Sequence, residues 1–345
     1  MHHIINPYIF DVTPPISAYS SMRQTFASDI AMFTIGGVEV PWGYDNTTVI
    51  FYDSANPISI YKALQDAGTY TTQATGVSNL SIRGMVNESG DTFFGNTSFT
   101  SRLYRLNAGG VLDYIDGGFT TVGAVARTGI VQTPINTGPD FVSFDDTGGE
   151  SKYLSSINWG AHTCVQTALG AASAPAKQNA NISGGRVYCS LSGAGAVGYV
   201  DTIGHSLVTL ITAATIPSYQ TGGYKNLIVG DDVNLYLIDG TNVKKFDNTG
   251  TLLGTYASGT ANFVPTCFTS ESGQYFLWLI YAPAGGMQYR KIRCSDMTLF
   301  ASGSIANAHG FQWFGVSGIH FNDGTSPVFY TLDASNKKYL GKLIP

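Results

Sequence analysis

Apolar and polar residues alternate in short runs along most of this chain, and residues typical of turns separate the runs. Val243-Lys244-Lys245-Phe246 is one example, because successive side chains of a strand point to opposite faces of a sheet. A recurring phrase leads from an apolar strand, through Asp or Asn and a turn with Gly or Ser, to a second apolar strand. Lys245-Phe246-Asp247-Asn248-Thr249-Gly250 contains the first half of this phrase. From Tyr44 onward the pattern predicts antiparallel hairpins throughout.

The Asp or Asn of this phrase, called the anchor below, recurs at a roughly regular spacing. The anchors are Asp53, Asn107, Asp145, Asp201, Asp247, Asp296 and Asp333. Their mean separation is about 47 residues, and a period of about 40–50 residues built from hairpins is typical of a propeller blade. We therefore predict an all-β fold, a β-propeller of about seven four-stranded blades. Six blades are the second choice, and a two-sheet sandwich or a β-solenoid stays open.

Two segments repeat one another closely and carry a family resemblance. Glu88-Ser89-Gly90-Asp91 and Glu271-Ser272-Gly273-Gln274 each launch an aromatic strand, which a loop with Gly or Ser reverses into an alternating strand. They resemble the repeat of β-propellers whose blades begin Ser-x-Asp-Gly and continue into a strand like Leu-Tyr-Val. The resemblance covers roughly residues 44–345. The Trp-Asp dipeptide, the Kelch double glycine with its partner aromatics and the sialidase box Ser-x-Asp-x-Gly-x-Thr-Trp are not present in the sequence.

The first part of the chain differs from the rest. We predict an N-terminal arm at 1–43 and the propeller at 44–345. The arm contains Pro14-Pro15, which breaks regular structure, and a loosely amphipathic stretch at 16–33 that suits a short helix or an irregular segment. Two uses of the arm are open. It could close the ring by pairing with the last blade, which removes exposed sheet edges, or it could anchor the protein to a larger assembly.

Composition narrows the classes of function. Only 12% of the 345 residues are charged and the net charge is −5, whereas about 25% is usual; no basic stripe is present, so we expect no nucleic-acid binding. No run of 18 apolar residues and no secretory leader pattern occurs, so we expect no membrane insertion. Gly193-Ala194-Gly195-Ala196-Val197-Gly198 matches a dinucleotide motif, but it continues as a strand rather than a helix. We expect no cofactor.

Two groups of residues are candidates for ligand or metal binding. Trp159 with His162, and His309 with Trp313, lie in segments interpreted as connections between blades, where propellers commonly carry ligands. Trp and His offer flat apolar faces and directional hydrogen bonds to a glycan or protein receptor; the alternative is that they pack between blades. The second group surrounds one Gly-rich turn, and its carboxylates suit Ca²⁺. It consists of Asp140, Asp145, Asp146 and Glu150.

No catalytic constellation can be assembled from the sequence, so we predict a non-enzymatic protein. The low charge, the distinct arm and the degenerate blades favour a structural or receptor-binding component of a bacteriophage virion, assembled in the host cytoplasm and exposed outside the cell. The opening Asn6-Pro7-Tyr8 is similar to openings of phage tail and virion proteins. Expected partners are other virion proteins, contacted through the arm, and a cell-surface glycan or protein receptor. The alternatives are a propeller hydrolase or lyase acting on glycans, and a lectin or scaffold propeller.

Overall fold

The fold is known from a computed structural model that describes most strands and part of the connections. The described residues are 18–26, 30–31, 33–35, 38–40, 48–53, 59–64, 69–74, 82–88, 91–96, 102–107, 109–116, 128–132, 141–145, 151–158, 160–171, 174–175, 181–182, 186–191, 196–201, 204–219, 227–230, 233–281, 286–306, 319–322, 327–332 and 338–344.

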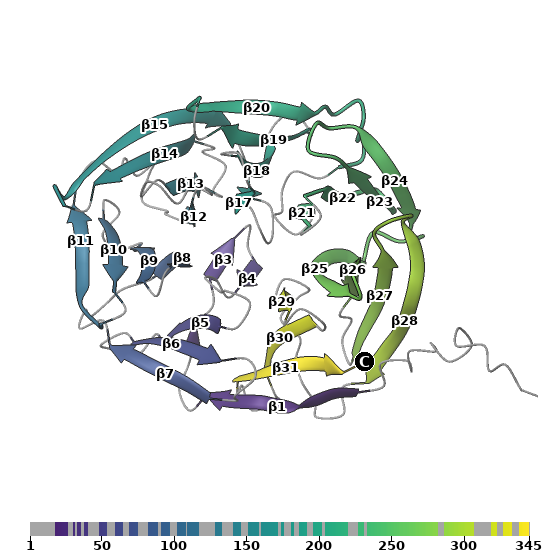
Figure 1. Cartoon of the computed structure of the whole chain (residues 1–345), viewed down its shortest axis with the longest axis horizontal. Coiled ribbons are helices and arrows are strands. Elements are labelled where there is room, and N and C mark those ends of the chain that lie inside the picture. Colours follow the sequence, from purple (N-terminus) through teal and green to yellow (C-terminus); the bar gives the residue numbers. More distant parts are fainter. Residues whose placement is uncertain are drawn as a thin grey trace, which may run out of the picture.

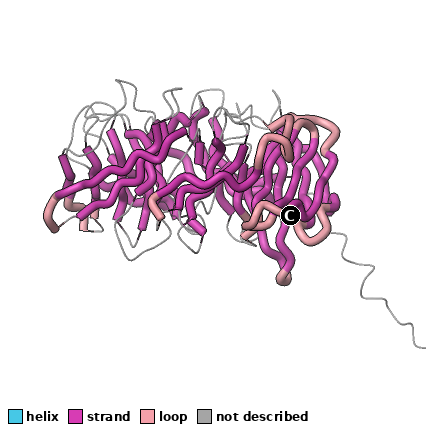
Figure 2. The backbone as a smooth tube through the Cα atoms, turned by 90° about the horizontal axis from the view of Figure 1, so that it is seen from above, coloured by secondary structure: helices cyan, strands magenta, loops and turns pink. Residues whose placement is uncertain are grey.

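The described strands form a closed ring of antiparallel sheets, which confirms the all-β and propeller predictions (Figure 1). Seven sheets of four or five strands follow one another around the ring in chain order, and seen from the side the ring is a flat disc (Figure 2). The count refers to the described residues, so the total number of blades stays a prediction. Within each sheet the strands pair side by side and antiparallel, and their order leads from the centre of the ring to its outer rim.

The first four sheets carry the following strands, from the centre outward. The first contains β2 (Ile30–Ala31), β5 (Thr48–Asp53), β6 (Ser59–Leu64) and β7 (Thr69–Ala74). The second contains β8 (Ile82–Glu88), β9 (Asp91–Asn96), β10 (Arg102–Leu106) and β11 (Leu112–Asp116). The third contains β12 (Thr128–Gln132), β13 (Phe141–Asp145), β14 (Ser151–Asn158) and β15 (Thr163–Ala171). The fourth contains β16 (Ala174–Pro175) and β17 (Asn181–Ile182), both paired with β18 (Arg186–Leu191), then β19 (Ala196–Asp201) and β20 (Ser206–Ile211).

The remaining strands complete the ring. The fifth sheet contains β21 (Leu227–Val229), β22 (Leu235–Asp239), β23 (Asn242–Phe246) and β24 (Leu252–Ala257). The sixth contains β25 (Val264–Glu271), β26 (Gln274–Tyr281), β27 (Gly286–Arg293) and β28 (Thr298–Ala306). The seventh contains β29 (Ile319–Asn322), β30 (Pro327–Leu332), β31 (Lys338–Ile344) and β1 (Ala18–Phe26). A separate two-stranded ladder joins β3 (Phe33–Ile35) to β4 (Val38–Val40).

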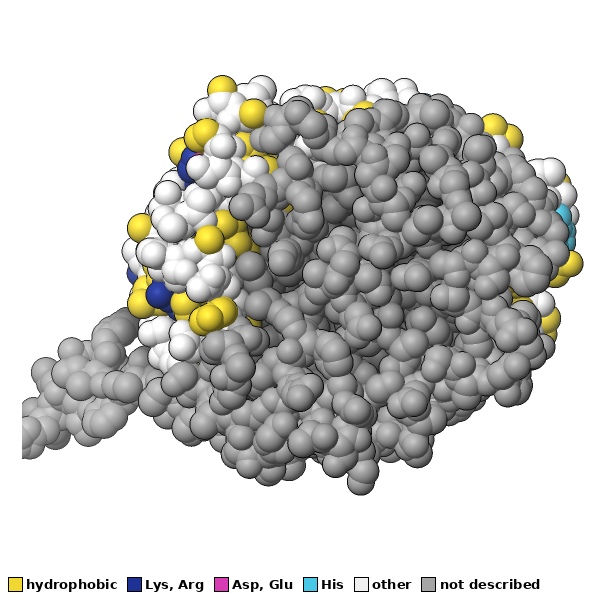
Figure 3. Space-filling view, turned by 180° about the vertical axis from the view of Figure 1, so that it is seen from behind, with side chains coloured by type: hydrophobic (Ala, Val, Ile, Leu, Met, Phe, Trp, Pro, Cys, Tyr) yellow, Lys and Arg dark blue, Asp and Glu magenta, His cyan; other side chains and the backbone are white. Residues whose placement is uncertain are grey.

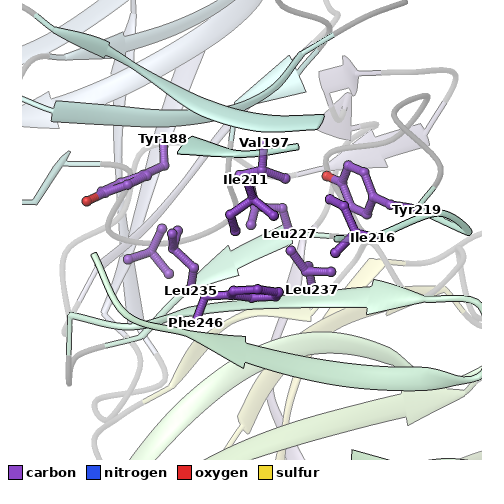
Figure 4. Close-up of a cluster of buried hydrophobic side chains, with 10 residues drawn as sticks. Tyr188, Val197, Ile211, Ile216, Tyr219, Leu227, Leu235, Leu237 and Phe246 are labelled. Atoms are coloured by element: carbon purple, nitrogen blue, oxygen red, sulfur yellow. The ribbon is translucent and has the colours of Figure 1, made fainter. Parts of the chain in front are cut away.

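The core lies between neighbouring sheets rather than within one sheet. All five residues of β22 are buried, because its two faces pack against different neighbours. Leu235 and Leu237 join a cluster with Tyr188 and Val197 of the fourth sheet (Figure 4). Tyr236 points the other way, into a cluster with Phe268 of the sixth sheet. Since burying one large apolar side chain stabilises the fold by about 1.5–3 kcal/mol, each sheet depends on both of its neighbours.

Residues 18–26 close the ring. β1 pairs with β31, with Ala18 opposite Ile344 and Phe26 opposite Lys338, so it forms the outermost strand of the seventh sheet. β2 then pairs with β5 in the first sheet. The expectation of a helix or an irregular segment at 16–33 is therefore wrong for 18–26, which extend as a strand because the edge of β31 supplies backbone partners. The domain boundary after residue 43 stays a prediction.

The structure explains why the anchors are unevenly spaced. Asn107, Asp201, Asp247 and Asp296 lie between the third and outermost strands of their sheets, whereas Asp53, Asp145 and Asp333 end or follow a second strand. When two successive anchors belong to different classes, their separation in sequence is therefore longer or shorter by one strand and its turn. Two positions match the first class by their place in the chain: Asp66, between β6 and β7, and Asn158, at the end of β14.

Candidate functional site

The structure describes one of the four predicted ligand residues. His162 lies in the turn between β14 and β15, the third and outermost strands of the third sheet, and its side chain is exposed. The interpretation of this segment as a connection between blades is wrong, because β15 runs back antiparallel along β14, with Asn158 opposite Thr163. Trp159, His309 and Trp313 lie outside the described residues. The strands before and after 307–318 do belong to different sheets, the sixth and the seventh.

His162 contacts the neighbouring sheet instead of a ligand face. Its Nε2 lies 3.0 Å from Oδ1 of Asp113, which belongs to β11, the outermost strand of the second sheet. This hydrogen bond, helped by the backbone N–H of Tyr114 and the charge of Arg105, lowers the pKa of the Asp113 carboxyl below its usual value. The contact joins two sheets at the rim, where Figure 3 shows His side chains in cyan. A separation of 49 residues hides this pair from any local sequence pattern.

The predicted metal site falls mostly outside the described residues. Asp145 ends β13, whereas Asp140, Asp146 and Glu150 are not described. Over the described part of the chain, no group of three or more His, Cys, Asp or Glu residues is arranged to hold a metal ion. Calcium binding at this turn stays a prediction. Cys189 and Cys294 are both buried.

Some basic side chains donate hydrogen bonds to backbone carbonyl oxygens of the neighbouring sheet. We call the boundary between two neighbouring sheets a seam. Arg186 of β18 donates from Nη1 to the carbonyl oxygen of Asn248 at 2.9 Å, across the seam between the fourth and fifth sheets. Lys245 of β23 is buried and donates from Nζ to the carbonyl oxygen of Cys294 at 2.8 Å, across the next seam. Such a contact removes the cost of burying a charge and a carbonyl without a partner. Neither residue was singled out by the sequence, because its partner lies 49 or more residues away.

Lys291 occupies an aromatic pocket within the sixth sheet. Its side chain is 4% exposed, and its Nζ binds the carboxylate of Glu271 and lies 4.3 Å from the ring centre of Phe276. The rings of Trp278 and Phe300 lie at 5.3 and 5.0 Å. A cation over aromatic faces is attracted by their quadrupoles. These rings and the carboxylate therefore surround a side chain of their own sheet.

Arg290 of the sixth sheet contacts residues that precede this sheet and follow the fifth, at the seam between the two. Its Nη1 donates to the carbonyl oxygen of Ser258 at 2.5 Å, and its guanidinium lies 4.1 Å from the ring centre of Phe263. Together with Lys245 and Lys291, it shows that strongly basic groups of β23 and β27 act in packing between and within sheets.

The outermost strands of the fifth and sixth sheets present apolar side chains to solvent. In β24 the ladder shifts between Lys245 and Phe246, which leaves Leu253 as an extra residue. In β28 an equivalent shift leaves Phe300 as the extra residue. Leu253 is 51% exposed, and the exposed residues beside the two bulges are Leu252 and Leu299. We call Leu252, Leu253, Leu299 and Phe300 the rim patch; hydrophobic side chains along this rim are yellow in Figure 3.

The rim patch lies on edge strands, where bulges have a recognised physical effect. An edge strand offers unpaired N–H and C=O groups to any passing strand, and a bulge disrupts that edge. The bulges of β24 and β28 thus disfavour pairing with foreign strands while they expose apolar side chains. Of the features in the described part of the chain, the rim patch is the best candidate for a contact surface.

No protein-family model matches this sequence. No curated protein matches it either. No helix long and apolar enough to span a membrane occurs among the residues that the structure describes.

Solved structures resemble the chain over almost its whole length. A catalytically inactive virginiamycin B lyase from Staphylococcus aureus, with quinupristin, is 15% identical with a TM-score of 0.59, over 93% of this chain and 99% of that one. YCF48 bound to D1 peptide is 8% identical with a TM-score of 0.58, over 93% and 94% of the two chains. The WD40 domain of Neurospora crassa Pan2 is 9% identical with a TM-score of 0.56, over 96% and 98%.

These neighbours include an enzyme, a protein with a bound peptide and a WD40 domain, so they share an architecture rather than an activity. At such low identity the likeness carries the fold alone, since one fold serves many unrelated functions. The chain is thus an all-β protein with the β-propeller fold.

Proposed function

We propose that this protein is a non-enzymatic propeller that works as a binding platform. The observation that carries the proposal is the rim patch, four exposed apolar side chains on two adjacent outermost strands. Exposed apolar side chains gathered on neighbouring strands favour contact with another macromolecule. The use of Lys245, Lys291 and Arg290 in packing supports the same assignment, because these groups serve the fold rather than a substrate.

We further propose that the platform belongs to a bacteriophage virion, as a structural or receptor-binding component. The low charge and the abundance of Gly and aromatic residues support a surface that recognises partners by hydrogen bonds and apolar contact. In this proposal the rim patch contacts other virion proteins, since residues 18–26 of the arm are already paired with β31. The receptor face remains assigned to His309 and Trp313, whereas Trp159 and His162 belong to the segment between β14 and β15, two strands of one sheet.

The test of the virion role is to express the tagged chain in cells that produce the phage and to analyse purified particles. Mass spectrometry should detect the protein in the particles at a fixed ratio to the capsid protein. The double variant Leu253→Ser/Leu299→Ser should fold but be depleted from particles. The matched control is Val165→Ser, which changes an apolar residue that is 67% exposed on the rim of the third sheet. Equal incorporation of both variants contradicts the rim contact, and absence of the wild-type chain from particles contradicts the virion role.

A glycan-processing enzyme, hydrolase or lyase, is the second candidate. It is kept because the β-propeller fold also occurs in an enzyme, a virginiamycin B lyase, so the fold by itself is compatible with catalysis. Incubation of the purified chain with a panel of polysaccharides should release no new reducing ends and no unsaturated sugars if the protein only binds. Turnover that scales with protein concentration would overturn the non-enzymatic proposal.

A further inference from the structure

The outermost strands of the ring contain far fewer charged residues than the third strands beside them. The seven described outermost strands contain 3 Lys, Arg, Asp or Glu residues among 50. The seven described third strands contain 12 among 45. Proteins commonly protect the free edge of a sheet with charged side chains, Lys above all. The usual arrangement is therefore reversed along this rim.

The reversal is complete in the fifth and sixth sheets, which carry the rim patch. β24 and β28 contain no charged residue among 15, whereas β23 and β27 contain five among 13. Of these five, Lys245 and Arg290 donate to backbone carbonyl oxygens at the seams. At the turn between β27 and β28, Nη2 of Arg293 lies 2.7 Å from Oδ2 of Asp296, so their charges balance. The rim patch thus lies on two strands without charge.

This distribution of charge restricts the kind of surface that can cover the rim patch. A charged group of a partner would find no opposite charge on β24 or β28, and burying an ion without a counter-charge is costly. An apolar group loses no hydrogen bond when it is buried there, and it gains free energy by leaving water. A neutral, apolar surface is therefore the best complement to these two strands.

On the basis of the proposed function, we propose that the rim patch binds an uncharged, apolar surface of another virion protein. The bulges of β24 and β28 disrupt the edges that a foreign strand would need. The contact is therefore made by side chains, and burial of apolar area rather than ion pairing drives it. Such a contact should tolerate no charge of either sign at its centre, and it should respond little to salt, which screens ion pairs.

Substitutions of both signs at one position test the neutrality of the partner. Thr255 and Ser302 are exposed, and they lie two positions after Leu253 and Phe300 on the same strands. Thr255→Lys and Thr255→Glu should each lower incorporation into purified particles by at least about tenfold, because either charge would be buried without a counter-charge. Thr255→Gln has a similar size without a charge and should be incorporated nearly as well as the wild type. Ser302 is changed in the same three ways as an independent position.

The matched control site is Gln274, which is exposed at the start of β26, the second strand of the sixth sheet. Gln274→Lys and Gln274→Glu should be incorporated as the wild type is. Tm of each purified variant verifies that it is folded. Particles with the wild-type chain are also washed in about 1 M NaCl, where charges more than about 3 Å apart are largely screened. The ratio of the chain to the capsid protein should then change by less than about twofold.

The outcomes separate this inference from the proposed function. Absence of the wild-type chain from particles overturns both. Opposite effects of Lys and Glu at Thr255, unimpaired incorporation of both variants, or release of the wild type by salt overturns only the neutral contact. Light scattering on the purified wild type gives a last check: a dimer that both Thr255→Lys and Thr255→Glu abolish would make a second copy of this chain the occupant, and would overturn the assignment to another virion protein.

Discussion

One side-chain oxygen organises the turn before an outermost strand. Oδ1 of Asp247 accepts hydrogen bonds from the backbone N–H groups of Thr249 and Thr251 at 2.8 and 2.9 Å. Asn107 accepts from Val111 in the same way at 2.9 Å. Both turns then use a glycine with positive φ, Gly250 at 88° and Gly110 at 84°, a conformation that costs glycine little. The acceptor oxygen, rather than the charge, is what the two turns share.

This shared geometry predicts unequal effects for two substitutions of Asp247. Asp247→Ala removes the acceptor and should lower the free energy of unfolding by about 1–2 kcal/mol, as loss of a cap does. Asp247→Asn keeps the acceptor, as Asn107 does, and should cost less than about 0.5 kcal/mol. Urea unfolding monitored by tryptophan fluorescence measures both. Equal losses for the two variants would show that charge, not the hydrogen-bond geometry, stabilises the turn.

The charge of Asp296 leads to a prediction about pH. Two hydrogen bonds lower the pKa of the Asp296 carboxyl from 3.8 to about 2. The hydrogen bond from Arg293 has the larger effect and the one from Thr298 the smaller. A carboxyl whose folded pKa lies below its unfolded value stabilises the fold above the unfolded pKa, and this contribution disappears as pH falls through the folded pKa. Tm should therefore fall between about pH 4 and pH 2, and Asp296→Asn should fall less steeply over the same interval. A parallel decline in the two proteins would rule out this contribution.

At the scale of strands and sheets, a close approach between two strands can require glycine at a single position. A Cβ on Gly198 would lie 2.1 Å from the carbonyl oxygen of Val208 and 2.9 Å from Cδ1 of Leu191. Gly198 stands where the ladder between β19 and β20 shifts register, and it is the last glycine of the motif that resembled a nucleotide-binding loop. The structure confirms that this glycine lies in a strand, and its lack of a Cβ lets β20 approach β19 closely.

Gly198→Ala should consequently destabilise the fold strongly, by about 3 kcal/mol, because backbone rather than a flexible side chain must move. The control is Gly109→Ala, where the nearest atom to a new Cβ is the side-chain oxygen of Asn107 at 3.3 Å. It should change stability by less than about 1 kcal/mol. Thermal unfolding of the two variants beside the wild type gives the comparison. Similar Tm values for all three would mean that β20 can shift away from β19 at little cost.

The sequence predicted the strands better than their place in a sheet. Alternating runs such as Val243–Phe246 and the turn residues after them specify hairpins locally, so the all-β ring could be inferred. An Asp or Asn followed by Gly satisfies any tight turn, however. Asp145 and Asp201 therefore look alike in sequence although they end a second and a third strand. For the same reason the sequence does not distinguish the turn that holds His162, which joins two strands of one sheet, from a connection between blades.

Contacts across seams could not be inferred at all. The partners of His162, Arg186 and Lys245 lie 49 to 62 residues away and carry no shared motif. They become neighbours only because successive meanders stack around a ring. Sequence pattern reports the period of a strand or a turn, and it contains no information on which faces of two sheets meet.

At the scale of the whole molecule, the beginning of the chain is part of the ring. Deletion of residues 1–26 removes β1 and bares the edge of β31, so we expect a loss of about 3 kcal/mol or more from the missing ladder and aggregation through the exposed edge. This differs from the behaviour of a detachable anchor, whose removal would leave stability unchanged. Calorimetry and light scattering on the truncated chain distinguish the two: an unaltered Tm in a monomeric product would contradict the structural role.

The burial of both faces of β22 has a consequence for how the protein melts. A linear array can fray from its ends, because a terminal repeat has one neighbour only. A circle has no terminal repeat, and losing one sheet would strip the inner surfaces of the sheets on either side. The closed ring therefore makes unfolding cooperative. All sheets should stay folded up to the transition and then unfold together in a single step.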